Sequence, residues 1–234
     1  MVRIGIVGVG FMGVTHFKAV EKVKGAKVTA IATRDEKKLR GDWRTVQGNF
    51  GGSGGRQDLK GISAYADVEE LLHDPKVDLV DICLPTTMHY DWTMKALEAG
   101  KHVFVEKPIS LDLKQAERMM ALAKKKRRRL MVAHVLRYFP EYALVKSLVD
   151  AKKHGKVLAA QFKRVISQPS WWNPKDLQRT GGPAIDLHIH DADFVQYLFG
   201  LPKAVTSAGL IRRGGVVEHI DTHYHYRSGA AISA

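Results

Sequence analysis

The chain has 234 residues, of which 45% are hydrophobic, and it carries a formal net charge of +13. This length and composition can support a sizeable core and fit two small domains. The single cysteine, Cys83, excludes an intramolecular disulfide framework and fits a reducing cytoplasm. A strand expected from Val2 leaves no room for a signal peptide, and no apolar run is long enough to span a bilayer.

The start of the chain predicts a dinucleotide-binding loop. Val2–Val7 is an apolar strand candidate that runs into Gly8-Val9-Gly10-Phe11-Met12-Gly13, and helical periodicity follows from Val14 to about Lys24. Where a strand is followed by G-x-G-x-x-G and a helix, the first glycine permits a tight turn and the second lets the backbone approach a pyrophosphate. The third allows close packing of the helix on the strand. The helix N-terminus then favours the negative charge of the cofactor. The alternative is a glycine-rich structural turn.

The end of the second expected strand, Lys27–Ala32, bears on the choice of cofactor, because an acidic residue there accepts hydrogen bonds from the adenosine ribose in NAD sites. Here the chain reads Thr33-Arg34-Asp35. A guanidinium suits a 2′-phosphate better than a bare hydroxyl, which favours NADP. Two alternatives stay open: Arg34 is solvent-exposed with Asp35 starting a helix, or Asp35 binds the ribose, which favours NAD.

Strand and helix signals alternate as far as Val135, which is typical of a parallel sheet covered by helices on both faces. The expected later elements are helices at Asp67–His73, Tyr90–Ala99 and Leu113–Ala123 and strands at Val77–Leu84, His102–Val105 and Leu130–Val135.

Ligands of open parallel sheets lie beyond the carboxyl ends of the strands, so the loops at Thr33, Pro85 and Glu106 should face the glycine loop across one crevice. Lys107 is the most interesting residue in these loops. A lysine beside a bound nicotinamide can hydrogen-bond the substrate oxygen and stabilise a developing alkoxide. The alternative is a surface lysine paired with Glu106. Pro108 fixes the chain direction after Lys107 and permits a cis peptide bond.

The run Lys124–Arg129 is the strongest argument for nucleic-acid binding in this basic chain. It closes an expected helix, however, where cations complement the helix dipole. The sequence contains no helix-turn-helix, zinc-finger or RNA-binding strand signature. We therefore expect no nucleic-acid partner and no membrane partner, and a positive field that attracts an anionic cofactor or substrate.

The segment from Gly181 to Asp193 predicts a helix that carries a proton acceptor. Gly182 and Pro183 suit its first turn, and Asp186, His190 and Asp193 follow at i, i+4 and i+7, on one face. A carboxylate beside a histidine can fix the ring and raise its basicity. The alternative is an amphipathic helix with polar surface groups.

A last strand, Val216–Tyr226, alternates in character. It places Glu218, Ile220, Thr222, Tyr224 and Tyr226 on one side and His219, Asp221, His223 and His225 on the other. A row of histidines can bind adventitious metal, but a polar surface facing solvent or a subunit is the favoured interpretation.

Three motifs in order, the Gly8–Gly13 loop, the tripeptide Glu106-Lys107-Pro108 and the spacing Asp186-x-x-x-His190, together resemble the Gfo/Idh/MocA family of oxidoreductases. The family includes glucose-fructose oxidoreductase and inositol dehydrogenase. The resemblance covers nearly the whole chain and implies an α/β fold. An N-terminal Rossmann domain with a doubly wound parallel sheet (1–135) would precede a C-terminal α+β domain with a largely antiparallel open sheet (136–234). That sheet often makes dimer or tetramer contacts, so a homodimer or homotetramer is expected.

The resemblance implies hydride transfer between NAD(P) and a secondary alcohol or carbonyl of a sugar, polyol or related small molecule. Lys107, Asp186 and His190 would be the catalytic group, with no metal. Pro85, Thr86 and His89 would lie along the nicotinamide side of the cleft, and Tyr138 could reach the substrate or belong to the core. The full set of expected cofactor-binding residues is Gly8, Gly10, Phe11, Met12, Gly13, Thr33, Arg34, Leu84, Pro85, Thr86, His89, Glu106 and Lys107.

Two departures accompany this resemblance. His188 stands where many relatives have a glycine, and relatives continue well beyond the unfinished strand at Ile232-Ser233-Ala234, so we expect a truncated second domain.

Two other functions stay open. Some relatives bind a dinucleotide as sensors or regulators without turnover. Metal-dependent hydrolysis through His188, His190, Asp191 and Asp193 has suitable ligand types but competes with the glycine loop.

Overall fold

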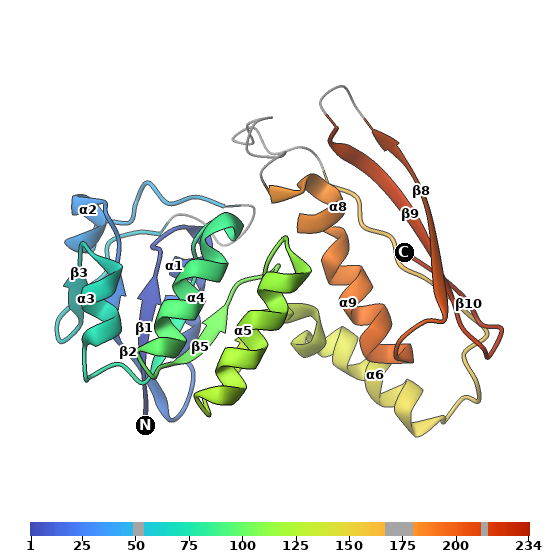
Figure 1. Ribbon diagram of the computed structural model, residues 1–234, viewed down its shortest axis with the longest axis horizontal. Helices are drawn as coiled ribbons and strands as arrows, with labels where there is room; N and C mark the ends of the chain where they lie inside the picture. Colours follow the sequence, from blue (N-terminus) through green and yellow to red (C-terminus); the bar gives the residue numbers. More distant parts are fainter. Residues whose placement is uncertain (49–53, 167–179, 212–214) are drawn as a thin grey trace. The chain divides into compact units, whose positions relative to one another are not determined.

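The computed structural model describes residues 1–48, 54–166, 180–211 and 215–234. They form two compact units, unit 1 at Met1–Ala133 and unit 2 at His134–Ala234, each of which is described by itself (Figure 1). Trp171 and Trp172, which could stack on a sugar face or serve in packing, lie outside the described residues.

Unit 1 is built on a six-stranded sheet in the order β3-β2-β1-β4-β5-β6, in which every neighbouring pair is parallel. The strand order reverses between β1 and β4, and ligands of such sheets bind at this switch point, beyond the carboxyl ends of the strands. The strands are β1 (Val2–Val7), β2 (Ala26–Ala32), β3 (Ser63–Tyr65), β4 (Leu79–Ile82), β5 (His102–Val105) and β6 (Leu130–Val132).

Helices cover both faces of this sheet. Val7 and Val80 pack with α3, α4 and α5 in one core cluster, whereas Ile6 and Ile31 pack with α1 and the buried Trp43 in the other. Figure 1 shows α3, α4 and α5 along the first face. Successive residues of a strand point to opposite faces of the sheet. The central strands are therefore mostly apolar on both faces. The helices are α1 (Phe11–Val20), α2 (Glu36–Leu39), α3 (Val68–His73), the 3₁₀ turn η1 (Thr86–Met88), α4 (His89–Glu98) and α5 (Leu113–Lys125).

The predicted elements of unit 1 are present in kind and order with bounds that differ by a few residues, whereas the edge strand β3 was not predicted. The helix expected from Val14 begins at Phe11 and ends at Val20, because Lys22 and Val23 donate tight-turn bonds to Ala19 and Val20. The basic run closes α5 as expected, and the backbone N–H of Arg128 returns to the Ala123 carbonyl.

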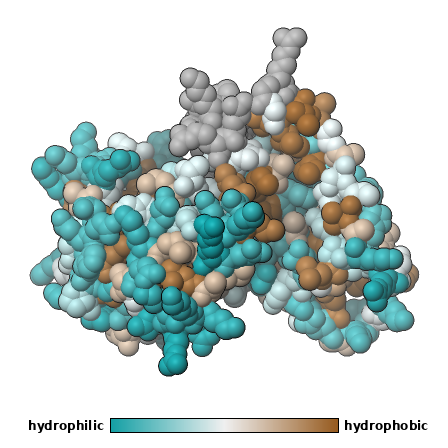
Figure 2. All heavy atoms as spheres, in the orientation of Figure 1, coloured by the Kyte–Doolittle hydropathy of each residue, from teal (hydrophilic) through white to brown (hydrophobic). Residues whose placement is uncertain are grey.

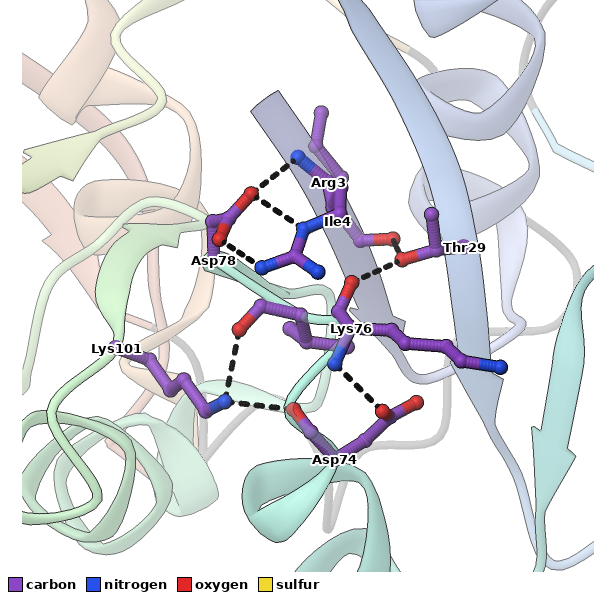
Figure 3. A network of polar contacts seen from close by, with 8 residues as sticks. Arg3, Ile4, Thr29, Asp74, Lys76, Asp78 and Lys101 are labelled. Carbon is purple, nitrogen blue, oxygen red and sulfur yellow. Dashed lines mark hydrogen bonds and ion pairs between the residues drawn. The ribbon is translucent and has the colours of Figure 1, made fainter. Parts of the chain in front are cut away.

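The end of the sheet where the strands begin, here called the amino rim, is held by a polar network (Figure 3). Asp78 accepts bonds from the backbone N–H and Nε of Arg3, both at 2.9 Å, and from Nη2 at 2.6 Å. Lys101 Nζ donates to the carbonyl oxygens of Asp74 and Val77 at 2.7 and 2.8 Å. Thr29 Oγ1 donates to the Lys76 carbonyl at 2.9 Å. These bonds join β1, β2, β4 and β5 at the rim away from the expected cofactor.

Unit 2 combines helices with a mixed four-stranded sheet in the order β7-β10-β9-β8. The β8/β9 and β9/β10 pairs are antiparallel, and β10/β7 is parallel. The elements are η2 (Val135–Tyr138), α6 (Pro140–Ala151), β7 (Ala159–Gln161), α8 (Gly182–Asp186), α9 (His188–Phe199), β8 (Ala204–Ile211), β9 (Val217–His225) and β10 (Ala231–Ser233). The two units together confirm the expected fold class.

The alternation predicted for the last long strand is present in β9. Thr222 and Tyr224 are buried, whereas His223 and His225 are exposed. Tyr224 packs with Val195 of α9 and Ile232 of β10, which places the core of unit 2 between the sheet and this helix.

The edge strand β8 is exposed along its whole length, with Leu210 and Ile211 each more than 60% exposed. On the face shown in Figure 2, hydrophobic side chains reach the surface over β8 and β9, whereas hydrophilic side chains dominate the surface of unit 1.

Candidate functional site

The glycine loop follows β1 and opens α1, as the sequence predicts. Gly8 has a positive φ of 96°, and a Cβ at this position would meet the Cys83 carbonyl oxygen at 2.7 Å. Gly10 is the N-cap of α1, with φ −94° and ψ −164°. The first turn of a helix has amides without intrahelical acceptors, which makes it a binding site for phosphate groups. The loop lies at the switch point between β1 and β4.

In the turn after β2, Asp35 caps a helix and Arg34 lies at the surface. Asp35 caps α2, and its Oδ1 accepts from the backbone N–H groups of Lys37 and Lys38 at 2.9 and 3.2 Å. Arg34 is exposed. Asp35 therefore starts a helix and Arg34 reaches the surface, and the role of Arg34 toward a cofactor stays a prediction. Both capping bonds use Oδ1 of the Asp35 carboxylate.

The loops after β4 and β5 are joined through His89. Its Nε2 lies 2.8 Å from the Leu84 carbonyl oxygen, and its Nδ1 lies 2.8 Å from that of Pro108. His89 is 1% exposed, and burial lowers its pKa although both carbonyl oxygens act in the opposite direction. Its described contacts thus hold the two loops together, whereas Pro85 is exposed and Thr86 half-buried at the loop surface.

Lys107 follows β5 after one residue, Glu106, at the same end of the sheet as the glycine loop. Its backbone N–H donates to Glu106 Oε2 at 3.2 Å, and the Lys107–Pro108 peptide bond is cis. Glu106 is buried, and its Oε1 lies 3.1 Å from Nε2 of His16. Glu106 therefore interacts with His16 and with the Lys107 backbone.

His16 was not singled out by the sequence analysis, yet it is the centre of a buried polar cluster. Its Nδ1 lies 2.9 Å from Asp81 Oδ2 and 3.3 Å from Cys83 Sγ. Burial acts to lower the pKa of His16, but the hydrogen bonds with Asp81, Cys83 and Glu106 outweigh it and raise the pKa well above its ordinary value. One signal was present in the sequence: Asp81 stands in an apolar central strand, where a carboxylate needs a cation or donors.

His16, Asp81 and Cys83 also bring three candidate metal-ligand atoms within 4.8 Å of one another. A metal there would have to displace the proton of a histidine whose pKa is raised. It would also have to displace that of a thiol, because burial, followed by the Asp81 charge, raises the pKa of Cys83 to about 12. In addition, the three groups already hydrogen-bond one another. This favours a proton-filled network over a metal site.

The helix predicted through Asp186, His190 and Asp193 is interrupted, so the expectation of one continuous helix is wrong. Leu187, with φ −105° and ψ −51°, separates α8 from α9. Asp186 ends the first helix and His190 lies in the first turn of the second. The His190 N–H bonds to the Leu187 carbonyl at 3.1 Å instead of continuing the i to i−4 pattern from Asp186.

The two later carboxylates of this segment have arginine partners. Asp193 accepts from Arg137 Nε at 2.8 Å and Nη2 at 2.5 Å, and Asp191 accepts from Arg164 Nε at 2.8 Å and Nη2 at 2.9 Å. These pairs neutralise two of the four ligands needed for metal-dependent hydrolysis, which weakens that alternative. Asp193 belongs to this ion pair rather than to a row with Asp186 and His190.

His188 lies next to Tyr224 of β9, with Nε2 at 3.3 Å from the phenol oxygen. Burial lowers the pKa of this histidine and raises that of Tyr224 to about 12. The side chain thus packs towards the sheet of unit 2. Tyr138, for which the sequence left substrate contact or a core position open, is 66% exposed and is not a core residue.

The structure therefore brings the expected cofactor-binding residues of unit 1 together at the carboxyl ends of the parallel strands. Asp186 and His190 belong to unit 2, and their approach to Lys107 stays a prediction. No helix in the described part of the chain is long and apolar enough to cross a membrane.

Comparison with known proteins places this architecture among the oxidoreductases with an NAD-binding Rossmann fold, whose family model matches residues 2–134. A second family model, the GFO/IDH/MocA C-terminal domain, matches residues 142–234. The chain belongs to the Gfo/Idh/MocA family of oxidoreductases.

Individual relatives carry more specific names. The scyllo-inositol 2-dehydrogenase (NAD(+)) of Bacillus subtilis is 32% identical over 240 residues, which cover 98% of this chain and 65% of that protein. The scyllo-inositol 2-dehydrogenase (NADP(+)) of the same species is 26% identical over 216 residues, which cover 91% and 56%. A solved structure of a probable dehydrogenase from Thermotoga maritima superimposes with a TM-score of 0.81 at 27% identity, over 99% of this chain and 67% of that one. The chain spans about half to two thirds of the length of the curated relatives it matches.

Proposed function

We propose that this chain carries out reversible hydride transfer between NADP or NAD and a secondary alcohol or carbonyl of a sugar, polyol or related small molecule. The observation that carries the proposal is the placement of Lys107 at the end of β5, on the sheet edge where the glycine loop opens α1. The inositol dehydrogenases among the relatives support a polyol as the substrate.

The residues of the glycine loop fit a dinucleotide. Among the described residues, no heavy atom beyond the adjacent residues and the helix's own backbone lies within 4 Å of the place that a Cβ on Gly10 would occupy. The backbone is thus open to close approach at the point where a pyrophosphate meets such a loop. Bound there, the cofactor would supply a hydride acceptor or donor at nicotinamide C4.

The side chains would divide the remaining work between them. His190 takes the proton of the substrate hydroxyl as the carbon-bound hydrogen leaves with its electron pair. Asp186 orients His190 and contacts the substrate, and the Lys107 ammonium stabilises the negative charge on the reacting oxygen. Lys107 and His190 can exchange these roles, so that Lys107 accepts the proton and His190 stabilises the reacting oxygen. Leu84, Pro85 and Thr86 shape the wall beside the nicotinamide, whereas the buried His89 ring joins the loops after β4 and β5.

We infer NADP as the preferred cofactor. Arg34 is exposed beside the expected adenosine ribose, and Asp35 directs Oδ1 to the α2 cap. A planar guanidinium offers the charge-assisted bonds that a 2′-phosphate accepts. NAD remains the second choice, because named relatives use either cofactor.

Two further properties complete the proposal. A homodimer or homotetramer would form through the sheet of unit 2, whose edge strand β8 exposes Val205, Leu210 and Ile211. A cytoplasmic location fits the single thiol of Cys83. Light scattering of the purified protein would measure the mass of the assembly, and a monomer would refute the oligomer.

The function is tested by following absorbance at the nicotinamide band with NAD and NADP against a panel of sugars and polyols. Lys107→Ala and His190→Ala should each lower kcat by about 10²-fold or more, because general acid–base catalysis contributes about 10² to 10⁴. Cofactor affinity should change little in both. Turnover near the wild-type value in either variant would refute its assignment. Tight dinucleotide binding without any turnover in the parent protein would favour the sensor.

A further inference from the structure

The two neighbours of Lys107 are each held by a histidine from a different helix. On one side, Glu106 Oε1 lies 3.1 Å from Nε2 of His16 in α1. On the other side, the Pro108 carbonyl oxygen lies 2.8 Å from Nδ1 of His89, the first residue of α4. The proposed chemistry uses neither of these two contacts.

Each histidine is itself fixed by a second anchor. His16 is held through its other nitrogen by Asp81 at 2.9 Å, and its ring packs on Phe104 of β5 with a centroid separation of 5.5 Å. His89 is held through Nε2 by the Leu84 carbonyl oxygen at 2.8 Å. Both rings therefore lie between two acceptors, which limits their rotation. The neutral form of His89 carries one N–H and donates to one of the two carbonyl oxygens at a time.

The contact with His16 continues to the backbone of Lys107. Glu106 uses Oε1 for His16 and Oε2 for the Lys107 N–H, at 3.2 Å. A movement of the His16 ring would therefore shift the Glu106 carboxylate and, through it, the backbone nitrogen of Lys107. His16 lies on α1, the helix that follows the glycine loop. The contact between His16 and Glu106 therefore connects Lys107 to the expected cofactor site.

We propose that His16 and His89 are positioning residues that hold the Glu106-Lys107-Pro108 segment from both sides. This inference rests on the proposed function only in assigning the substrate oxygen to Lys107. Reactions lose about 10²-fold in rate when a reacting group is misplaced by about 1 Å, so small shifts of this segment matter.

Amide side chains test the two contacts separately, because asparagine places a nitrogen near Nδ1 of histidine and glutamine places one near Nε2. At position 16 the contact with Glu106 uses Nε2, so His16→Gln should keep it and His16→Asn should lose it. At position 89 the contact with Pro108 uses Nδ1, so His89→Asn should keep it and His89→Gln should lose it. The order of the two substitutions is thus reversed between the positions.

We expect His16→Asn and His89→Gln to lower kcat by about 10- to 100-fold while the dissociation constant for NADPH changes by less than about threefold. His16→Gln and His89→Asn should stay within about fivefold of the parent kcat. His73→Asn, which changes an exposed histidine of α3 in the same unit, is the control and should leave both constants unchanged.

A readout independent of turnover is the hydrogen exchange of the Lys107 amide, measured by NMR. The exchange should accelerate about tenfold or more in His16→Asn and stay near the parent rate in His16→Gln. Equal kcat for the two amides at both positions, or the same order at both, would overturn the proposal. If one position does not tolerate substitution, the other decides alone. If the parent protein shows no hydride transfer, the proposed function fails, whereas the exchange of the Lys107 amide still tests the positioning role.

Discussion

Gly13 lies so close to the carbonyl oxygen of Gly8 that a Cβ on Gly13 would overlap that atom. The close approach lets the first turn of α1 pack against the end of β1. Gly10, two residues after Gly8, differs, because among the described residues only its neighbours in the chain lie within 4 Å of a Cβ added there. The first contact belongs to the fold, and the open space beside Gly10 belongs to the candidate site.

Gly10→Ala should therefore affect cofactor binding, whereas Gly13→Ala should affect stability. Gly10→Ala should keep Tm within a few degrees and weaken binding of NADPH by about tenfold or more, because the methyl group occupies the approach of the pyrophosphate. Gly13→Ala should lower Tm markedly or prevent folding. Thermal denaturation and fluorescence titration measure both effects. Unchanged NADPH affinity in a folded Gly10→Ala protein would contradict the placement of the cofactor.

Arg34→Ala tests the choice of cofactor. Loss of charge-assisted hydrogen bonds to a 2′-phosphate should raise the dissociation constant for NADPH by about tenfold, since such bonds contribute about 1.5 kcal/mol or more. The constant for NADH should stay within about twofold. Lys37→Ala in the neighbouring helix is the control for a general loss of positive charge. Equal weakening of both cofactors by Arg34→Ala would point to an electrostatic role without recognition of the phosphate.

The buried cluster around His16 predicts a pH-dependent contribution to stability. The groups that face His16 are Asp81 and Cys83 from the β4 end and Glu106 from the β5 end. Because the folded state raises the pKa of His16, the folded protein holds a proton that the unfolded chain releases above about pH 6.5. The stabilisation is therefore complete below that pH and declines as the pH rises.

Comparison with His16→Gln measures this contribution. The difference in the free energy of unfolding between the parent and the variant should shrink from pH 6 to pH 9, by about 1.4 kcal/mol per pH unit at most. Urea denaturation at several pH values provides the measurement. A difference that does not shrink above about pH 6.5 would show that the histidine is neutral in the folded protein.

Cys83 should react slowly with alkylating reagents. Burial, followed by the Asp81 charge, raises the pKa of this thiol to about 12, and the thiolate is the reactive form. At pH 8 iodoacetamide should modify the folded protein about a thousandfold more slowly than the chain in urea. Mass spectrometry of the Cys83 peptide gives both rates, and comparable rates would show that the cluster is open to solvent.

Asp78→Ala probes the amino rim. The Arg3 guanidinium holds the pKa of Asp78 well below its usual range, so the pair stabilises the fold above about pH 4 and loses this effect as the pH falls. Both side chains are more than a third exposed, and we expect a loss of about 1 kcal/mol at neutral pH. The affinity for NADPH should be unchanged. Reduced affinity in a fully folded variant would mean that the two ends of the sheet are coupled.

Much of the Rossmann unit could be predicted because its signals are local. The apolar strands, the glycine loop and the helices between them follow from short-range patterns, and the strand at His102–Val105 agrees residue for residue. The helix expected from Tyr90 begins one residue earlier, at His89. The His89 ring contacts the carbonyl oxygens of Leu84 and Pro108. The cis peptide bond at Pro108 could only be given as one of two isomers.

The parts that could not be predicted depend on contacts between distant residues. The break at Leu187 leaves no mark in the helical pattern, but the arginine pairs of Asp191 and Asp193 join this segment to Arg164 and Arg137. Likewise, His16 and Glu106 are 90 positions apart in the sequence, and only the parallel sheet brings them together. The approach of Asp186 and His190 to Lys107 belongs to the same class of long-range relationships and is tested by the kinetic variants.

The polar groups at the two ends of the parallel sheet have separate consequences for how the protein tolerates change. In a saturation mutagenesis experiment, substitutions at Arg3, Asp78 and Lys101 should appear as reduced abundance alone, whereas those at His16 and Glu106 should also reduce turnover per molecule. An engineer could then raise thermal tolerance at one end of the strands without retuning catalysis at the other.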